Sequence, residues 1–172
     1  MLSDKMLEAL NEQINRELYS EYLYLSMAAW FEDQGLPGFA AWMRAQTQEE
    51  HFHAMKLFDY VNEVNGKVSL KTIEGPPVDF ESPLAIFEAS LEHEKYITAS
   101  INERMKLAMD ESDFATANFL QWYVAEQVEE EANVGAVVDK LRLSGGQGNA
   151  ILMLDQQLGT RVFTQPTAAD EA

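Results

Sequence analysis

Four long stretches of the chain repeat apolar residues every three and four positions, the spacing of a helix with one buried face. They cover residues 3–34, 38–65, 82–109 and 113–143, and a shorter stretch covers 149–158. Ser3 and Ser82 are suited to cap two of these helices, and Pro83 fits a first helical position. No stretch sustains the alternation of a strand. The pattern predicts an all-α fold of four long helices and a short fifth one.

The connections predict how the helices are arranged. The short Gly-Leu-Pro-Gly link at 35–38 implies antiparallel neighbours. A helix of about 28 residues is about 42 Å long, and the connection 67–82 reaches about 50 Å when extended. We therefore expect a four-helix bundle whose second and third helices are parallel and joined by a long crossover. Residues 1–161 would form one domain, and 162–172 a flexible tail.

The inner face of each long helix is largely apolar at both ends and polar in the middle. The inner positions, helix by helix, are Leu7, Leu10, Ile14, Glu17, Glu21, Tyr24, Ala28 and Phe31; Phe39, Met43, Gln46, Glu50, His53, Leu57, Tyr60 and Val64; Leu84, Phe87, Leu91, Glu94, Thr98, Ile101, Met105 and Ala108; and Thr116, Leu120, Tyr123, Gln127, Glu130, Val134, Val137 and Leu141. Because each interruption is central, parallel and antiparallel neighbours deliver it to the same level.

This layer carries more acid than the inner faces can neutralise. Glu17, Glu50, Glu94 and Glu130 would be buried together, and no Lys or Arg occupies an inner position. Buried, unpaired charges cost several kcal/mol each, and like charges repel. Two divalent cations would balance these four carboxylates. Oxygen ligands with one imidazole, from Glu50-x-x-His53, favour iron or manganese over structural zinc. The alternative is that one or two of these acids point outward.

Composition narrows the function. The 172 residues include 29 acids against 12 Lys and Arg, a net charge of -17. This charge argues against binding nucleic acid or an anionic membrane and is compatible with attracting cations. The chain has no cysteine, which excludes thiol catalysis and iron–sulfur clusters. Neither a signal-peptide pattern nor a run long enough to span a membrane is present. We expect a soluble, cytoplasmic protein.

Over nearly its whole length the chain resembles the non-haem bacterial ferritins. The motifs that carry the resemblance are Glu17-Leu18-Tyr19 followed by Tyr24, Glu49-Glu50 with His53, Glu94, Glu126-Gln127 with Glu129-Glu130, and the segment Gly-Asn-Ala-Ile-Leu-Met-Leu-Asp-Gln-Gln-Leu at 148–158. The resemblance implies a ferritin-like four-helix bundle, with the short fifth helix at the fourfold axes of a 24-subunit homo-oligomeric shell.

The same resemblance implies a di-iron centre at the polar layer. Glu17, Glu50 and His53 would hold one iron. Glu50, Glu94 and Glu130 would hold the second, so that Glu50 bridges the pair.

Further residues take roles by the same resemblance. Gln127 would lie beside the second iron, and Tyr24 next to the pair, although Tyr24 could equally be a packed core residue. A third iron site would lie toward the shell interior. Its residues would be Glu49, Glu126 and Glu129, with Glu130 shared. The alternative for these acids is an ordinary solvated helix face.

Some positions depart from related families. Bacterioferritins repeat Glu-x-x-His on the fourth helix, where this chain has Gln127-x-x-Glu130. Their haem-ligating methionine follows the bridging glutamate, where this chain has His51, so we predict no haem. His51 and His93 lie off the inner faces, at a surface or interface. Tyr19, Tyr22 and Leu23 would form an outer apolar face, which suits oligomerisation.

These observations predict an iron-storage ferritin. Its ferroxidase centre would oxidise Fe²⁺ with O₂ or H₂O₂, and the ferric product would collect as a mineral inside the shell. Two alternatives remain open. One is a di-iron oxidase or peroxidase that acts on a small molecule, and the other is a metal-buffering cage without fast oxidation.

Overall fold

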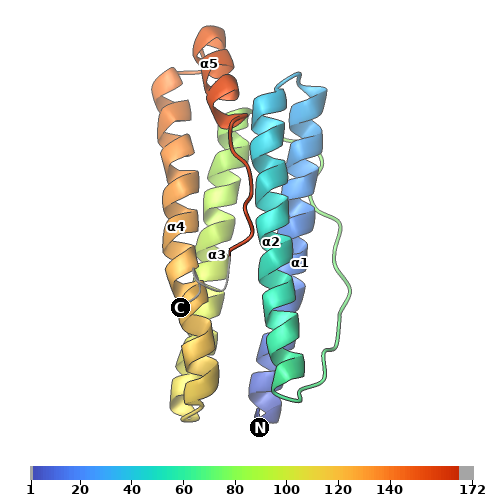
Figure 1. Cartoon of the computed structure of the whole chain (residues 1–172). Helices are drawn as coiled ribbons and strands as arrows, with labels where there is room; N and C mark the ends of the chain where they lie inside the picture. The colour runs from blue at the N-terminus through green and yellow to red at the C-terminus, as the bar shows by residue number, and fades with distance from the viewer. Residues whose placement is uncertain (1, 167–172) are drawn as a thin grey trace.

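The computed structural model describes residues 2–166 and consists of a four-helix bundle with a fifth helix at one end (Figure 1). The helices are α1 (Asp4–Asp33), α2 (Pro37–Glu63), α3 (Pro83–Asp110), α4 (Phe114–Ser144) and α5 (Gly148–Leu158). Within the described residues there is no strand. The predicted all-α fold is confirmed.

The ends of the helices follow from local chemistry. The Ser3 hydroxyl accepts the Met6 amide at 3.0 Å, and the Ser82 hydroxyl accepts that of Ala85 at 3.1 Å. These caps satisfy backbone N–H groups that have no partner inside the helix. Helix α4 stops at Gly145, whose φ of +57° is left-handed. The predicted boundaries therefore agree with the observed ones to within one or two residues.

A long crossover joins α2 to α3 and runs along the outside of the bundle, so that these two helices are parallel as predicted (Figure 1). Asn11 of α1 holds it at two points. The Asn11 amide donates to the Lys67 carbonyl at 3.1 Å, and its oxygen accepts the Ser69 N–H at 2.7 Å. Farther along, the Ser26 hydroxyl donates to the Pro77 carbonyl at 2.6 Å. These bonds satisfy backbone N–H and C=O groups of a connection that has no secondary structure of its own.

Two apolar cores fill the bundle, one on each side of a polar middle. Near α5, Phe31 and Phe39 stack at 4.9 Å with Phe87 beside them. At the other end, Leu10 and Leu57 belong to a second cluster of buried aliphatic and aromatic residues. The polar layer between them is therefore shielded from water on both sides, which strengthens every charge interaction within it.

Helix α5 is anchored to the start of α2. The Asp155 carboxylate accepts the Phe39 N–H at 2.9 Å, where α2 has no side-chain cap of its own. A Cβ at Gly38 would lie 1.7 Å from the Asp155 carbonyl oxygen, so only glycine allows this approach. The contact fixes the direction in which the chain leaves α5.

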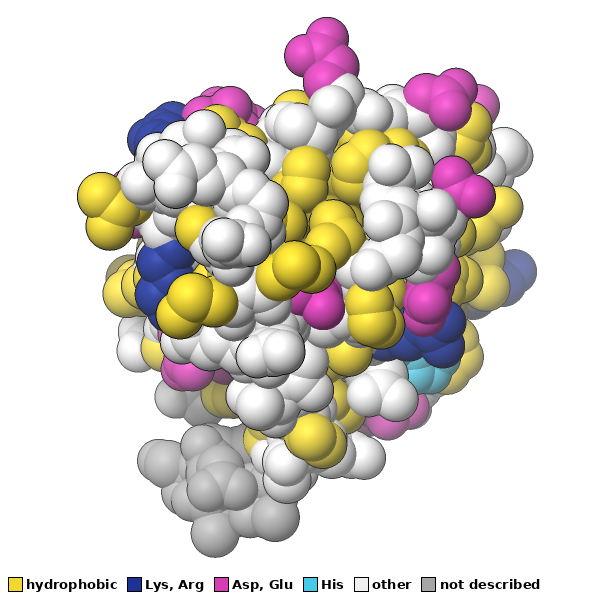
Figure 2. Space-filling view, turned by 90° about the horizontal axis from the view of Figure 1, so that it is seen from above, with side chains coloured by type: hydrophobic (Ala, Val, Ile, Leu, Met, Phe, Trp, Pro, Cys, Tyr) yellow, Lys and Arg dark blue, Asp and Glu magenta, His cyan; other side chains and the backbone are white. Residues whose placement is uncertain are grey.

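The end of the bundle that carries α5 is rich in exposed apolar side chains (Figure 2). Leu143 of α4 and Leu152 and Met153 of α5 are among the most exposed large hydrophobic residues. Such a patch marks a surface for association. On the predicted outer face of α1, Tyr22 is exposed but Leu23 is buried, so the prediction for Leu23 was wrong.

Beyond α5, residues 161–166 run back along the bundle without helical structure (Figure 1). The rest of the predicted flexible tail, 167–172, lies outside the described residues, and the domain boundary at 161 stays a prediction. One buried cation was not anticipated, since Arg104 of α3 is almost fully enclosed. None of the helices in residues 2–166 is long and apolar enough to cross a membrane.

Candidate metal centre

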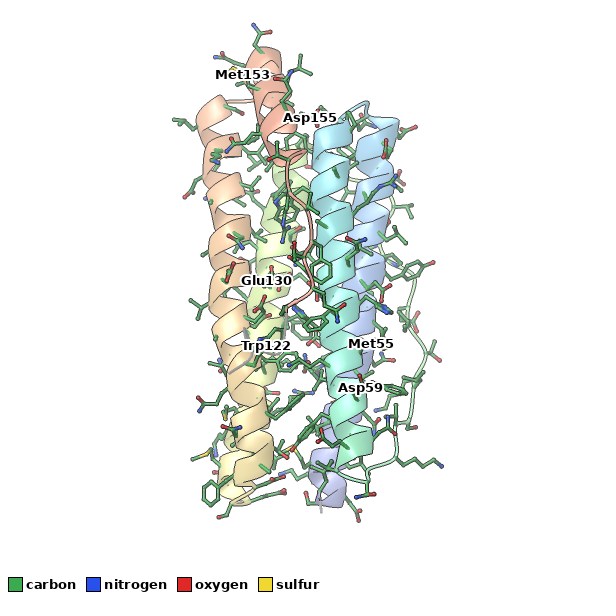
Figure 3. The ribbon with its side chains drawn as sticks, viewed as in Figure 1. Met55, Asp59, Trp122, Glu130, Met153 and Asp155 are labelled. Atoms are coloured by element: carbon green, nitrogen blue, oxygen red, sulfur yellow. The ribbon has the colours of Figure 1, made fainter. Side chains whose placement is uncertain are left out.

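The polar layer predicted from the sequence exists at mid-height in the bundle. Glu17 of α1, Glu50 and His53 of α2, Glu94 of α3 and Glu130 of α4 are all nearly inaccessible to solvent. Figure 3 locates Glu130 on α4, in the middle of the bundle. Four helices thus bring together, in one buried layer, five side chains of the kinds that can bind metal ions.

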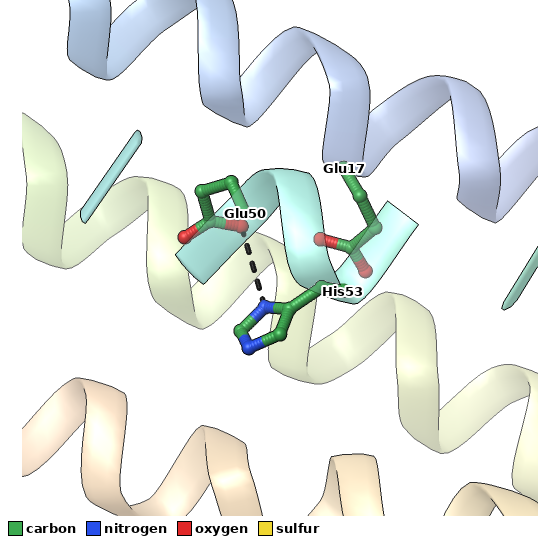
Figure 4. Close-up of side chains that lie close together, drawn as sticks. All are labelled: Glu17, Glu50 and His53. Atoms are coloured by element: carbon green, nitrogen blue, oxygen red, sulfur yellow. Dashed lines mark ion pairs between the residues drawn. The ribbon is translucent and has the colours of Figure 1, made fainter. Parts of the chain in front are cut away.

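The α1–α2 half of the layer contains Glu17, Glu50 and His53, whose side chains approach one another (Figure 4). One ligand atom of each lies within 4.8 Å of the other two. The His53 Nδ1 is 3.5 Å from a Glu50 carboxylate oxygen. One Glu17 oxygen accepts from the Gln13 amide at 2.7 Å, whereas the other is buried with no donor in the described structure. An unsatisfied buried carboxylate oxygen beside an imidazole suits a cation.

The α3–α4 half contains Glu94, Gln127 and Glu130, and its carboxylates already have donors. The Tyr24 hydroxyl donates to one Glu94 oxygen, and the Gln127 amide donates to the other at 3.2 Å. A Glu130 oxygen accepts from the Gln46 amide at 2.9 Å. Both Glu94 oxygens and one Glu130 oxygen therefore have hydrogen-bond donors, whereas one Glu17 oxygen in the α1–α2 half has none.

Gln46 joins the two halves, because its amide nitrogen also donates to Glu50 at 2.9 Å. The sequence places Gln46 on the inner face of α2, but it was given no role in the site. Its position one helical turn before Glu50 was the available signal.

Burial sets the protonation of the layer. It raises the pKa of Glu17 to about 7, and the nearby negative charge of Glu50 adds to the effect. Burial also raises the pKa of Glu50 and of Glu94 to about 8. The pKa of Glu130 is raised by burial and then by the charge of Glu94. In the absence of a cation, some of these carboxyl groups would stay protonated at neutral pH, and a bound cation would displace the protons.

The carboxylates predicted for a third site lie beside this layer but do not form one compact group. Glu126 faces His53 Nε2 at 4.0 Å, and these two residues with Glu130 make a second cluster within 4.8 Å. Glu49 accepts a hydrogen bond from Arg161, and Glu129 is exposed. Their joint role in binding a third iron stays a prediction.

Aromatic residues of α4 hold His53 in place. The Tyr123 hydroxyl donates to the His53 carbonyl at 2.8 Å. The Trp122 ring, labelled in Figure 3, meets the imidazole edge-on with centroids 5.4 Å apart. This packing fixes the backbone and the ring of the predicted ligand.

The remaining histidines lie outside the centre. His51 is exposed, and its Nδ1 lies 3.1 Å from Glu21. The prediction that Glu21 faces inward was wrong, because Ser20 takes that place and Glu21 reaches the surface. His93 lies between α1 and α3 and shares a 2.7 Å hydrogen bond with Ser20. Burial lowers the pKa of His93 to about 4, so its ring is neutral at pH 7.

Comparison with known proteins shows close similarity along almost the whole chain. The ferritin-like domain family matches residues 7–144. The bacterial non-heme ferritin of Campylobacter jejuni is 44% identical over 158 residues, which is 92% of this chain and 95% of that protein. That of Escherichia coli O157:H7 is 42% identical over 160 residues, 93% and 97% of the two chains.

Solved structures agree in fold. An engineered closed form of the Archaeoglobus fulgidus ferritin is 57% identical and superposes with a TM-score of 0.94, covering 95% of this chain and all of the other. The open-pore ferritin from the same archaeon is also 57% identical, with a TM-score of 0.93 over 94% of this chain and 99% of the other.

Proposed function

Because the chain belongs to the ferritin family, we propose that it stores iron and oxidises Fe²⁺ to Fe³⁺ at the buried polar layer. The observation that carries the proposal is the enclosed cluster of Glu17, Glu50 and His53, with its unsatisfied Glu17 oxygen. Without a metal, a proton shared between Glu17 and Glu50 would compensate the burial of these carboxyl groups, and a bound cation would take the place of that proton.

Iron is the substrate of this centre. Glu17, Glu50 and His53 would receive one Fe²⁺, and Glu50, Glu94 and Glu130 the other, with Glu50 shared. Four ionised carboxylates balance the charge of two Fe²⁺ ions. Since burial raises the pKa of Glu17, Glu50 and Glu94, iron binding releases protons from this layer.

The oxidation moves two electrons. Each Fe²⁺ gives up one, and O₂ takes both with two protons to become H₂O₂. Alternatively, H₂O₂ takes two electrons and two protons to become two waters. The protein positions both ions at one level, while the redox chemistry belongs to the iron. Tyr24 and Gln127 would steady Glu94, to which both donate hydrogen bonds.

The product would leave the centre and accumulate as a ferric mineral inside a shell. We propose a homo-oligomer of 24 subunits in the cytoplasm. The exposed apolar residues at the α5 end, Leu143, Leu152 and Met153, support association through that end.

Iron loading tests the proposal. Fe²⁺ is added to the assembled protein in air, far beyond two ions per chain, and oxidation and sedimentation are followed. We expect soluble particles that sediment faster as they fill with mineral. Retention of only two irons per chain without mineral would instead indicate an oxidase that acts on a small molecule. Tight metal binding with slow O₂ consumption would indicate a metal-buffering cage.

A further inference from the structure

Arg161 is the first residue of the segment 161–166, which follows α5 without regular secondary structure, and its side chain reaches back to α2. One guanidinium nitrogen donates to the Gln46 oxygen at 2.8 Å, and another donates to Glu49. The guanidinium also lies over the Trp42 ring, 4.2 Å from its centroid. Its side chain is only 19% exposed. The contacts on three sides hold the cation in one place.

The bond to Gln46 orients that amide. Because Arg161 donates to the amide oxygen, the nitrogen must face the other way. It there donates to Glu50 and to Glu130, each at 2.9 Å. Arg161 is thus connected through one side chain to carboxylates of both halves of the metal centre.

The bond to Glu49 occupies a carboxylate that iron would need. Glu49 lies at the edge of the centre, next along α2 from Glu50, and its side chain is 20% exposed. A guanidinium keeps its charge at every physiological pH, and its flat shape suits a carboxylate. A metal ion that binds Glu49 must therefore compete with Arg161 for the negative charge of this carboxylate.

We propose that Arg161 is a positioning residue that acts as the built-in counter-cation of the edge of the centre. It holds Glu49 away from iron and keeps Gln46 turned toward Glu50 and Glu130. Iron that moves from the di-iron layer toward Glu49 and Glu126 competes with this ion pair, so Arg161 weakens the binding of iron there. The inference rests on the proposed function, because it concerns the path of the same iron.

Anaerobic calorimetric titration of the assembled protein with Fe²⁺ tests this directly. Wild type is compared with Arg161→Gln, which removes the cation. The matched control is Arg142→Gln, which removes a surface cation paired with Glu88 at 2.7 Å. We expect Fe²⁺ beyond the first two per chain to bind on the order of tenfold more tightly to Arg161→Gln, since a charged hydrogen bond no longer competes. Equal affinities in Arg161→Gln and Arg142→Gln would overturn the proposal.

Two further variants separate competition from a structural effect. In a Glu49→Gln background the added Arg161→Gln change should leave the third affinity where it was, because no carboxylate remains to be freed. Arg161→Lys keeps the charge but cannot hold Gln46 and Glu49 together, so its third affinity should fall between those of wild type and Arg161→Gln. If Arg161→Gln does not assemble, Arg161→Lys decides, and an affinity equal to that of wild type overturns the proposal.

The outcomes also distinguish the two proposals. If wild type binds fewer than two Fe²⁺ per chain or oxidises them slowly, the proposed function fails whatever Arg161 does. If wild type binds and oxidises iron as expected but the Arg161 variants match the control, only the role of Arg161 is wrong.

Discussion

The two halves of the buried layer hold their carboxylates in different ways. In the α1–α2 half, Glu17 keeps one oxygen without a donor, and His53 approaches Glu50 at 3.5 Å. In the α3–α4 half, both Glu94 oxygens accept hydrogen bonds, from Tyr24 and Gln127. A cation can bind the free Glu17 oxygen without replacing a hydrogen bond, whereas at Glu94 it meets two oxygens that already have donors.

This difference predicts an order of events. A carboxylate whose two oxygens already accept hydrogen bonds gains less from a cation than one with an unpaired oxygen, because the donors already compensate part of its charge. We therefore expect the α1–α2 half to fill first and the α3–α4 half second. The asymmetry is increased by the single imidazole, because Glu130 stands where a second Glu-x-x-His motif would put another one.

The change with the largest expected effect is Glu50→Ala, because Glu50 is the carboxylate predicted to serve both halves. Its loss should slow the fast oxidation of Fe²⁺ by more than about a hundredfold, as both ions lose a ligand. Stopped-flow absorbance of the ferric product measures this rate. Glu21→Ala is the matched control, since Glu21 is partly exposed and pairs with His51. Fast oxidation by Glu50→Ala would show that the site assignment is wrong.

His53→Ala tests the α1–α2 half by removing its imidazole. The family resemblance assigns its imidazole to the iron of the α1–α2 half, so the first Fe²⁺ equivalent should bind roughly ten- to a hundredfold more weakly in an anaerobic titration. The neighbouring His51→Ala is the control, because that ring is exposed. An unchanged first equivalent in His53→Ala would contradict preferential filling of this half.

Tyr24→Phe tests the other half by removing a single hydroxyl. Glu94 would lose one donor, and that hydroxyl would no longer compete with a metal ion for the carboxylate. The second Fe²⁺ equivalent should therefore bind several-fold more tightly, and the affinities of the first and second equivalents should become more similar. Tyr22→Phe, an exposed position on the same helix, serves as the control in the same titration. An affinity for the second equivalent that falls or stays the same would mean that the Tyr24 hydroxyl does not compete with metal at Glu94.

The smallest expected effect is on stability against pH. Burial raises the pKa of Glu17 to about 7 and of Glu50 and Glu94 to about 8, from 4.5. Between pH 4.5 and about pH 8 the folded protein binds more protons than the unfolded chain, so the free energy of unfolding falls as pH rises through this range. With a chelator present, Tm should therefore fall as pH rises from 5.5 to 8.

Two comparisons check that the slope belongs to this layer. With added Zn²⁺, Tm should rise with pH instead of falling, since a cation binds the ionised carboxylates best. Glu50→Gln should flatten the slope, because the amide does not titrate. A chelated wild type whose Tm rises from pH 5.5 to 8 would contradict the shifted protonation of these residues.

Much of the fold could be predicted because its determinants are local. Caps at Ser3 and Ser82 set helix starts, and Gly145 sets an end. All eight inner positions predicted for α4 are buried: Thr116, Leu120, Tyr123, Gln127, Glu130, Val134, Val137 and Leu141. The prediction failed at Glu21, because a step of three or of four from Glu17 is equally regular. Packing against α3, through His93, selected Ser20.

The sequence by itself determined that four helices would bring acidic residues and one imidazole to a common buried level, because helical period and central position are properties of each segment. Only the tertiary structure decided how those groups pair. It left one Glu17 oxygen without a donor while giving Glu94 two. It also brought Arg161 to Gln46 across 115 positions of sequence. That contact depends on the docking of α5 through Asp155 and Gly38, and no local pattern encodes the distance between two segments that meet only after packing.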